Sequence, residues 1–353
     1  MLRRCAAFAV VLLASAALLS PLAARAWLAK SGEEMTARAD KFLAALNAEE
    51  AKKATMAYDD PKRVDWHFIP KKERKGLQIR EMSDSQKQAA HALLKACLSE
   101  IGYDKATKIM ELEELLHELE TKKKANVNIR DTQRYYFTVF GKPAADGKWG
   151  LSIEGHHLTL NFVVEKNKVI SSTPTVFCTN PAVVMTDLVP KFKGRRVLEQ
   201  EQTLAFELLA SLTAEQRKIA LTSNECPKEV RAAGEAQPPQ EAPIGISAAK
   251  LTSEQAGLLR KLIGVYCHNL PEDVAAERLA GIDAAGFDKV HFAWMGAQKP
   301  GVGHYYRIQG PTFVIELVNL QPDADGNPAN HVHSIYRNLA GDFALPVKEP
   351  AAK

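Results

Sequence analysis

The sequence predicts an α+β fold: an antiparallel or mixed sheet built from two related halves, with helices packed on it. Three observations predict it. Several segments share one helix-start signature, other stretches alternate apolar and polar residues as half-buried strands do, and those stretches recur at a spacing of 155 residues. Strands that bury one face and helices that bury one stripe pack most simply as layers.

Helices are predicted where a Ser or Thr stands three residues before a Gln and directly after an apolar residue. The hydroxyl caps a free backbone N–H group, the Gln reaches back, and the apolar residue forms a hydrophobic staple. The signature occurs at Ser83 to Gln86, Thr213 to Gln216 and Thr252 to Gln255. The predicted helices cover residues 84–98, 214–221 and 253–267, and composition adds helices over 33–53 and 105–121.

Two β-rich stretches match one another at the 155-residue spacing. The segment Leu151–Gly155 aligns with Tyr306–Gly310, and three apolar residues beyond each glycine also align. These are Leu158, Leu160 and Phe162 in the first stretch and Phe313, Ile315 and Leu317 in the second. Both stretches are rich in β-forming residues and predict paired strands. A diverged duplication explains the match, and two ordinary hairpins that match by chance are the alternative.

The first 26 residues predict a cleavable secretory signal peptide. Two arginines precede an apolar run over residues 6–19, Pro21 ends the run, and Ala24-Arg25-Ala26 provides a small-x-small cleavage pattern. The run is shorter than the roughly 20 apolar residues of a permanent membrane helix; an uncleaved anchor is the alternative. We therefore expect a secreted or periplasmic protein, cleaved near Ala26, without a permanent membrane span.

Removal of that segment changes the charge balance. It carries three of the 46 basic residues and none of the 42 acidic ones, which leaves 43 basic residues against 42. Such a balance gives no overall field that would attract nucleic acid. Four cysteines remain without a Cys-x-x-Cys pair, and one disulfide, two or none are open alternatives.

A stretch rich in Pro, Ala, Gly and charged residues divides the mature chain. It has no apolar period and predicts a surface linker over residues 226–245. The N-terminal helical segment and first β-rich half then cover residues 27–225, and a second helix and β-rich half cover 246–353. We expect the two halves to form one composite domain.

Two histidine motifs are the strongest candidates for chemistry: His156-His157 and His331-Val332-His333. Imidazole is a good ligand for zinc, iron or copper, and His-x-His on one strand supplies two ligands on the same face. We expect the duplicated strands to bring His157 to the second motif, with His156 turned toward the core. A divalent metal site formed from these histidines is one interpretation, and a polar cluster without metal is the other.

Strand faces predict the companions of the histidines. His333 and Arg337 share a face, His157 and Asn161 share another, and Glu316 takes the place of Asn161 in the duplicated strand. Glu316 is the predicted metal ligand or general base, and Arg337 is predicted to orient an anionic substrate. No Gly-x-Ser-x-Gly, Walker loop, His-Glu-x-x-His or cupin spacing occurs.

Six further residues are candidates for substrate binding, each with a structural alternative. Aromatic residues beside an arginine can stack on a ligand and pin it, and loops often carry binding residues; aromatic residues on a strand are more often core. The candidates are Tyr305, Tyr306, Arg307, Trp66, Arg74 and Asn161.

At these residues the chain resembles a family of secreted bacterial and fungal proteins known as domain of unknown function 3500. The resemblance covers most of the mature chain, and its motifs together are specific. They include Trp66-x-Phe68-x-Pro70, Arg130-Asp131, Phe140-Gly141-x-Pro143, Glu154-Gly155-His156-His157, Tyr305-Tyr306-Arg307 and Asn330-His331-x-His333. The resemblance implies export and brings no established reaction.

Three functions are consistent with these residues. The first is a metal-dependent enzyme that acts on a small-molecule or extracellular polymer substrate; a hydrolase is the simplest form because metal-bound water becomes a nucleophile near neutral pH, and a copper or iron oxidoreductase would use the same site. The second is a periplasmic metal carrier without turnover. The third is a metal-free protein that binds a small ligand through the tyrosines and Arg307.

Overall fold

The computed structural model describes residues 30–124 and 127–347. The predicted signal peptide lies outside these ranges. Within them, no helix is both long and apolar enough to cross a membrane. The four cysteines of the described chain are all free: Cys97, Cys178, Cys226 and Cys267.

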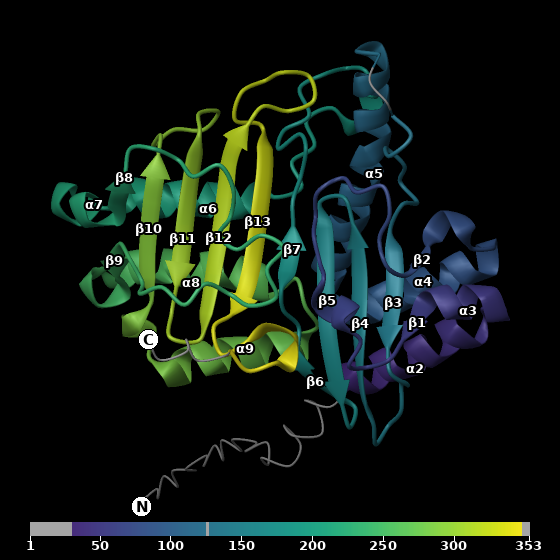
Figure 1. Cartoon of the computed structure of the whole chain (residues 1–353). Coiled ribbons are helices and arrows are strands. Elements are labelled where there is room, and N and C mark those ends of the chain that lie inside the picture. Colours follow the sequence, from purple (N-terminus) through teal and green to yellow (C-terminus); the bar gives the residue numbers. More distant parts are fainter. Residues whose placement is uncertain (1–29, 125–126, 348–353) are drawn as a thin grey trace, which may run out of the picture.

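One mixed sheet of 13 strands runs through the described chain (Figure 1). Its main path is β1-β3-β4-β5-β7-β13-β12-β11-β10-β8, and β2, β6 and β9 pair with β3, β5 and β10. β1 is parallel to β3 and β8 is parallel to β10, whereas the other pairs are antiparallel. The strands are β1 (Thr55–Met56), β2 (Leu77–Gln78), β3 (Tyr136–Phe140), β4 (Lys148–Gly155), β5 (Leu158–Glu165), β6 (Lys168–Ser171), β7 (Thr175–Phe177), β8 (Leu221–Ser223), β9 (Ile246–Ser247), β10 (His291–Gly296), β11 (His304–Gln309), β12 (Phe313–Gln321) and β13 (His331–Asn338).

Eight α-helices accompany the sheet in the described ranges. They are α2 (Lys30–Ala44), α3 (Ala48–Ala54), α4 (Asp84–Cys97), α5 (Glu100–Lys122), α6 (Glu199–Ser211), α7 (Ala214–Ala220), α8 (Ser253–Cys267) and α9 (Glu272–Ala285). The three helices predicted from the capping signature are α4, α7 and α8, and each has the predicted capping box. The single helix predicted over 33–53 is wrong: α2 and α3 are separate because Asn47 opens a new capping box with Glu50.

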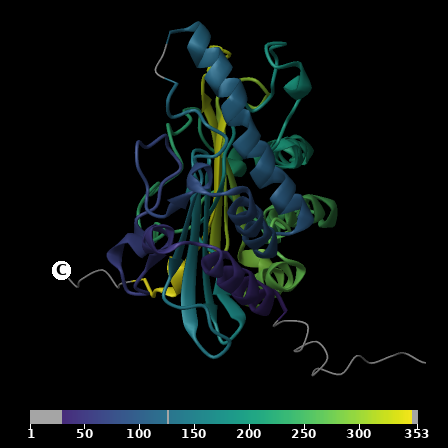
Figure 2. The ribbon, with the colours of Figure 1, turned by 90° about the vertical axis from the view of Figure 1, so that its right-hand side faces the viewer.

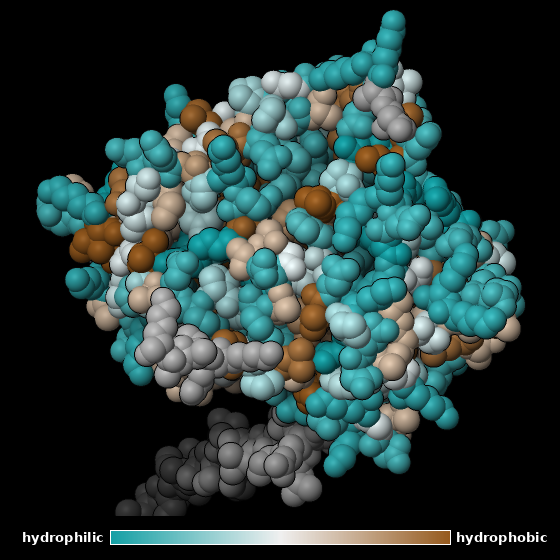
Figure 3. Space-filling view, in the orientation of Figure 1, coloured by the Kyte–Doolittle hydropathy of each residue, from teal (hydrophilic) through white to brown (hydrophobic). Residues whose placement is uncertain are grey.

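The two faces of the sheet are covered differently. Helices α2, α4, α5, α6, α8 and α9 pack on one face, where the larger apolar core lies (Figures 1 and 2). Loops cover the opposite face and bury a smaller cluster that includes Trp66, Phe68, Val230 and Phe343. Residues 226–245, predicted as a surface linker, cross this second face and bury Val230 against it. On the side of the molecule seen in Figure 3, hydrophobic residues are scattered and not gathered into one patch.

The centre of the sheet joins strands that are distant in the sequence. β7 pairs with β5 on one side and with β13 on the other, and an isolated bridge extends the second pairing from Thr179 to Val332. The end of the β4–β5 hairpin therefore lies close to the first residues of β13. The α+β class and the mixed sheet are confirmed, and this junction places the two histidine motifs side by side.

A buried three-histidine site

His156 and His157 form the turn between β4 and β5. The sequence placed both on the strand, but β5 begins only at Leu158, so the predicted alternation of faces does not apply to them. His157 has φ 64, a left-handed conformation that non-glycine residues rarely adopt and that often marks a functional site. Two backbone hydrogen bonds fix it there, one from His157 N–H to Phe68 O and one from Cys178 N–H to His157 O, both at 2.8 Å.

His331 and His333 lie at the start of β13, two residues apart, so their side chains leave the strand on the same face. The His331 N–H group donates to Asn319 Oδ1 at 3.0 Å, at a point where the β12–β13 register shifts. Because β13 is tied to the segment after β7, both rings reach the β4–β5 turn.

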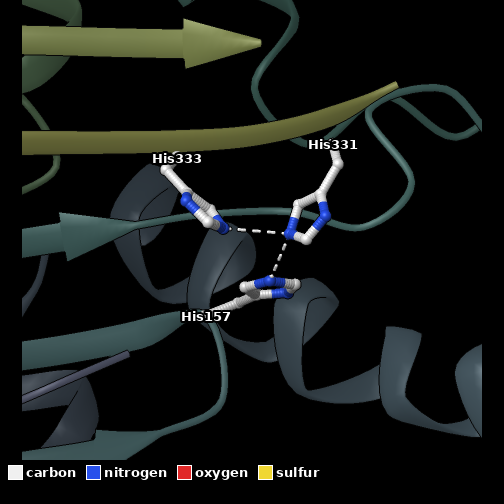
Figure 4. A group of neighbouring side chains, drawn as sticks. All are labelled: His157, His331 and His333. Carbon is white, nitrogen blue, oxygen red and sulfur yellow. Dashed lines mark hydrogen bonds between the residues drawn. The ribbon is translucent and has the colours of Figure 1, made fainter. Parts of the chain in front are cut away.

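The three rings point their Nε2 atoms toward one another (Figure 4). His331 Nε2 lies 2.8 Å from His157 Nε2 and 2.9 Å from His333 Nε2. Each residue offers a ligand atom, and these atoms all lie within 4.8 Å of one another. The predicted approach of His157 to the second motif, 174 residues away, is therefore present in the structure.

These contacts cannot all be hydrogen bonds. A ring nitrogen has one in-plane position, which holds either a proton or a lone pair. His331 Nε2 faces two other nitrogens with that single position, so a hydrogen bond can satisfy only one of the two contacts. A cation held between the rings would accept all three lone pairs at once.

Burial keeps two of the rings neutral. It lowers the pKa of His157 well below the ordinary value, and the nearby imidazoles lower it further. Burial also lowers the pKa of His331 to about 2, with the charge of neighbouring His333 acting in the same direction. Neutral imidazole is the form that binds metal, so these rings are in the required state.

Glu229 fixes the third ring. Its two carboxylate oxygens lie 2.7 and 2.9 Å from His333 Nδ1, so that nitrogen carries the proton and donates it to the carboxylate. The Nε2 atom is then left with a free lone pair that faces the other two rings. Phe68 contacts the His333 ring at its edge, with ring centres 4.9 Å apart. A carboxylate behind a histidine is the usual way in which proteins orient a metal ligand.

A second group that could hold an ion consists of Glu113, His156 and His157. His156 points away from the three-histidine site and binds the Glu113 carboxylate on α5, while its ring stacks on that of His157. Arg130 Nη1 lies 3.0 Å from His156 Nδ1, and the guanidinium forms a two-pronged pair with Glu120. Because a guanidinium already supplies positive charge here, this group is better described as an ion-pair network that supports the turn.

The two residues predicted for catalysis bind other parts of the protein. The Glu316 carboxylate accepts hydrogen bonds from the backbone N–H and the side chain of Arg231, and it is not a member of either ion-binding group found among the described residues. Arg337 pairs with Asp342 at 2.7 Å and donates to the backbone oxygens of Ala232 and Glu235. Both side chains hold the loop at 226–245 and the chain after β13 against the sheet.

The predicted substrate-binding residues are buried and bind protein atoms. Trp66 Nε1 donates to Glu235 O, and Arg74 donates to the backbone oxygens of His67 and Ile69. The remaining four residues follow the same pattern. Asn161 donates to Pro174 O, and Tyr305 packs in the smaller apolar cluster under the loops. Tyr306 donates to Glu201 O, and Arg307 donates to Ala242 O. The structure does not bring these six residues to the histidines as a ligand-contacting set.

Sequence reasoning did not find two carboxylates that bind the histidines. Glu229 lies in the stretch interpreted as a linker, where nothing in the residue pattern distinguishes it from the acidic residues around it. Glu113 had a usable signal in the sequence, because it lies among the leucines of the segment that forms α5; in the structure it is 2 % exposed.

The fold and the site define an α+β protein with a buried group of three histidines that could hold a metal ion. Residues 29–345 match a family described as protein of unknown function (DUF3500), and the chain belongs to this family. No curated protein and no solved structure matches it.

Proposed function

We propose that this protein is exported and is a metal-dependent enzyme, with hydrolysis as the favoured reaction. His157, His331 and His333 hold one divalent ion, either zinc, iron or copper. The observation that carries the proposal is the convergence of three Nε2 atoms, two of them 2.8 and 2.9 Å from the third. Three histidines with an open fourth position are a frequent ligand set of catalytic zinc.

The chemistry follows from what these residues supply. A bound divalent ion lowers the pKa of a coordinated water toward neutrality and so provides a hydrolytic nucleophile. Glu229 keeps His333 in the tautomer whose Nε2 is free, and burial lowers the pKa of His157 and of His331 and so keeps both rings neutral. His331 is only half-buried, and we propose that water and substrate reach the site from its side.

The site supports the two alternative functions, a metal-free ligand-binding protein and a metal carrier, to different degrees. A metal-free ligand-binding protein is disfavoured, because His331 Nε2 could not satisfy both of its nitrogen neighbours. A metal carrier would use the same three ligands without turnover. Activity separates the carrier from the enzyme.

The test begins with the metal content of the full-length secreted protein. We expect about one equivalent of metal in the wild type and almost none in His331→Ala, while exposed His268→Ala, the matched control, keeps its metal. Replacement by cobalt should give the visible absorption of a tetrahedral site, lost in His331→Ala. A panel of chromogenic esters and phosphate esters then tests hydrolysis. Equal metal content in all three proteins would overturn the metal site, and metal without turnover of any ester would favour the carrier.

We also infer that the two halves arose by duplication. At the 155-residue spacing, β3 corresponds to β10, β4 to β11 and β5 to β12. The edge strands pair at corresponding positions: Tyr136 with Gln78 and His291 with Ser247, then Val139 with Thr55 and Trp294 with Leu221. This match favours a second half that begins near α6, before the predicted boundary at 246.

A further inference from the structure

We propose that a second site, a cavity between β6, α9 and the end of β13, binds a small oxyanion such as a carboxylate or phosphate group. The cavity has a volume of about 210 Å³. That is less than the ~300–1,000 Å³ of pockets for drug-sized ligands, so its occupant is a small molecule. This site does not depend on the metal proposed above.

Arg278 supplies the positive charge of this cavity. Its guanidinium lies over the Tyr336 ring, 4.0 Å from the ring centre, and its Nη2 donates to the carbonyl and hydroxyl oxygens of Ser172, both at 2.7 Å. These contacts hold the group in place without neutralising it. Among the described residues no carboxylate lies within ion-pair distance of Arg278; its neighbour Glu277, which also lines the cavity, pairs with Lys168 at 2.9 Å.

Hydroxyl groups complete the lining. Ser171, Ser172, Thr312 and Asn338, which all have polar side chains, are among the residues that line the cavity. The Ser171 hydroxyl has no hydrogen-bond partner among the described residues although it is buried, and buried polar groups are normally paired. An unneutralised guanidinium beside an unused hydroxyl donor is a donor set that suits an oxyanion.

The position of the cavity in the fold adds independent support. At the 155-residue spacing, His157 corresponds to Thr312, which lines the cavity. Thr175 and Tyr336 occupy corresponding positions, because they pair with Leu160 of β5 and Ile315 of β12, which are themselves 155 residues apart. Three residues before them lie Ser172 and His333. The cavity thus occupies the place that the three-histidine site has in the other half, with Thr312 and Ser172 where that site has His157 and His333, and with apolar Ile170 where it has His331.

Binding is tested on the full-length protein in a chloride buffer by calorimetric titration with inorganic phosphate and, separately, with malonate. We expect saturable binding of at least one probe, and Arg278→Gln should weaken it by at least about tenfold, the loss of one charge-assisted contact. Phosphate binding alone identifies a phosphate-bearing ligand, and malonate binding alone identifies a carboxylate. Arg260→Gln, on the surface of α8, is the matched control and should bind as the wild type does.

Two further variants keep the test decisive if Arg278→Gln folds poorly. Gly281 lines the cavity, and a Cβ there would meet nothing within 4 Å, so Gly281→Leu fills the space while it favours the helix. We expect it to abolish binding without loss of thermal stability. Ser171→Ala should weaken binding by about threefold, a typical single hydrogen bond. Failure of the wild type to bind either probe, or unchanged binding by Gly281→Leu, would overturn the proposal.

Discussion

The Nδ1 atom of His333 lies 2.7 Å from a carboxylate oxygen of Glu229, although 104 residues separate them in the sequence. The pair connects β13 to the loop that crosses the sheet, and it fixes both the tautomer and the orientation of the ring. Loss of a contact that only orients a metal ligand should weaken metal binding less than loss of the ligand itself.

Glu229→Ala should therefore weaken metal binding by about 10–100-fold without abolishing it. Loss of a carboxylate that hydrogen-bonds to a metal-bound histidine typically lowers metal affinity by that factor. Competition with a chromogenic chelator measures the affinity. Glu229→Gln should lie between Ala and the wild type, since its amide oxygen still accepts a hydrogen bond from Nδ1. The exposed residue Glu225, which lies just before the same loop, provides the control Glu225→Ala. An affinity of Glu229→Ala equal to that of the wild type would show that the carboxylate does not position His333.

Removal of the metal should destabilise the folded state. The ion would bind the three converged rings, which exist only when the sheet is formed, so binding stabilises the native protein by mass action. We expect a strong chelator to lower the unfolding free energy by about 3 kcal/mol, which corresponds to binding about 100-fold above the dissociation constant. Denaturant unfolding with and without chelator measures it, and His331→Ala should show no difference between the two conditions. A chelator effect that persists in His331→Ala would place the metal elsewhere.

Some of this site is visible in the sequence and some is not. Ser83, Thr213 and Thr252 predicted three helix starts correctly because a capping box is local to four residues. The histidine motifs were found for the same reason. Glu229 was missed because its role depends on where a patternless loop crosses the sheet. The strand-face rule identified the side of β12 on which Glu316 lies, but it could not tell that Arg231 from this loop binds the carboxylate.

Gly155 is required by the close packing of the histidine turn. A Cβ at this position would lie 2.1 Å from Tyr135 Cδ1, and the Tyr135 hydroxyl donates to His156 O at 3.0 Å. Gly155→Ala should destabilise the protein by about 1–3 kcal/mol, as other overpacking substitutions do, and should also lower the metal content because the turn that carries His157 must shift. Gly257→Ala, in open space on α8, is the control and should be neutral or stabilising by up to about 1 kcal/mol. Equal stabilities of the two variants would contradict the packing argument.

His304 predicts how stability changes with pH. Its ring is stacked on Trp294 with centres 5.4 Å apart, its Nδ1 donates to Val302 O, and its Nε2 is buried with no hydrogen-bond partner in the described part of the chain. Burial lowers its pKa below the ordinary value of 6.5. As the pH falls below about 6.5, the unfolded chain therefore takes up a proton at this residue that the folded protein does not bind. The contribution of neutral His304 to the unfolding free energy is present above that pH and is lost as the pH falls toward the lowered pKa. Each unit of difference in pKa is worth about 1.4 kcal/mol.

His304→Phe keeps the ring stack and removes the titration. In urea unfolding, its unfolding free energy should fall less between pH 7 and pH 5 than that of the wild type. His268→Phe, at an exposed position, should keep the wild-type pH dependence. A pH dependence of His304→Phe as steep as that of the wild type would show that other groups carry the acid sensitivity.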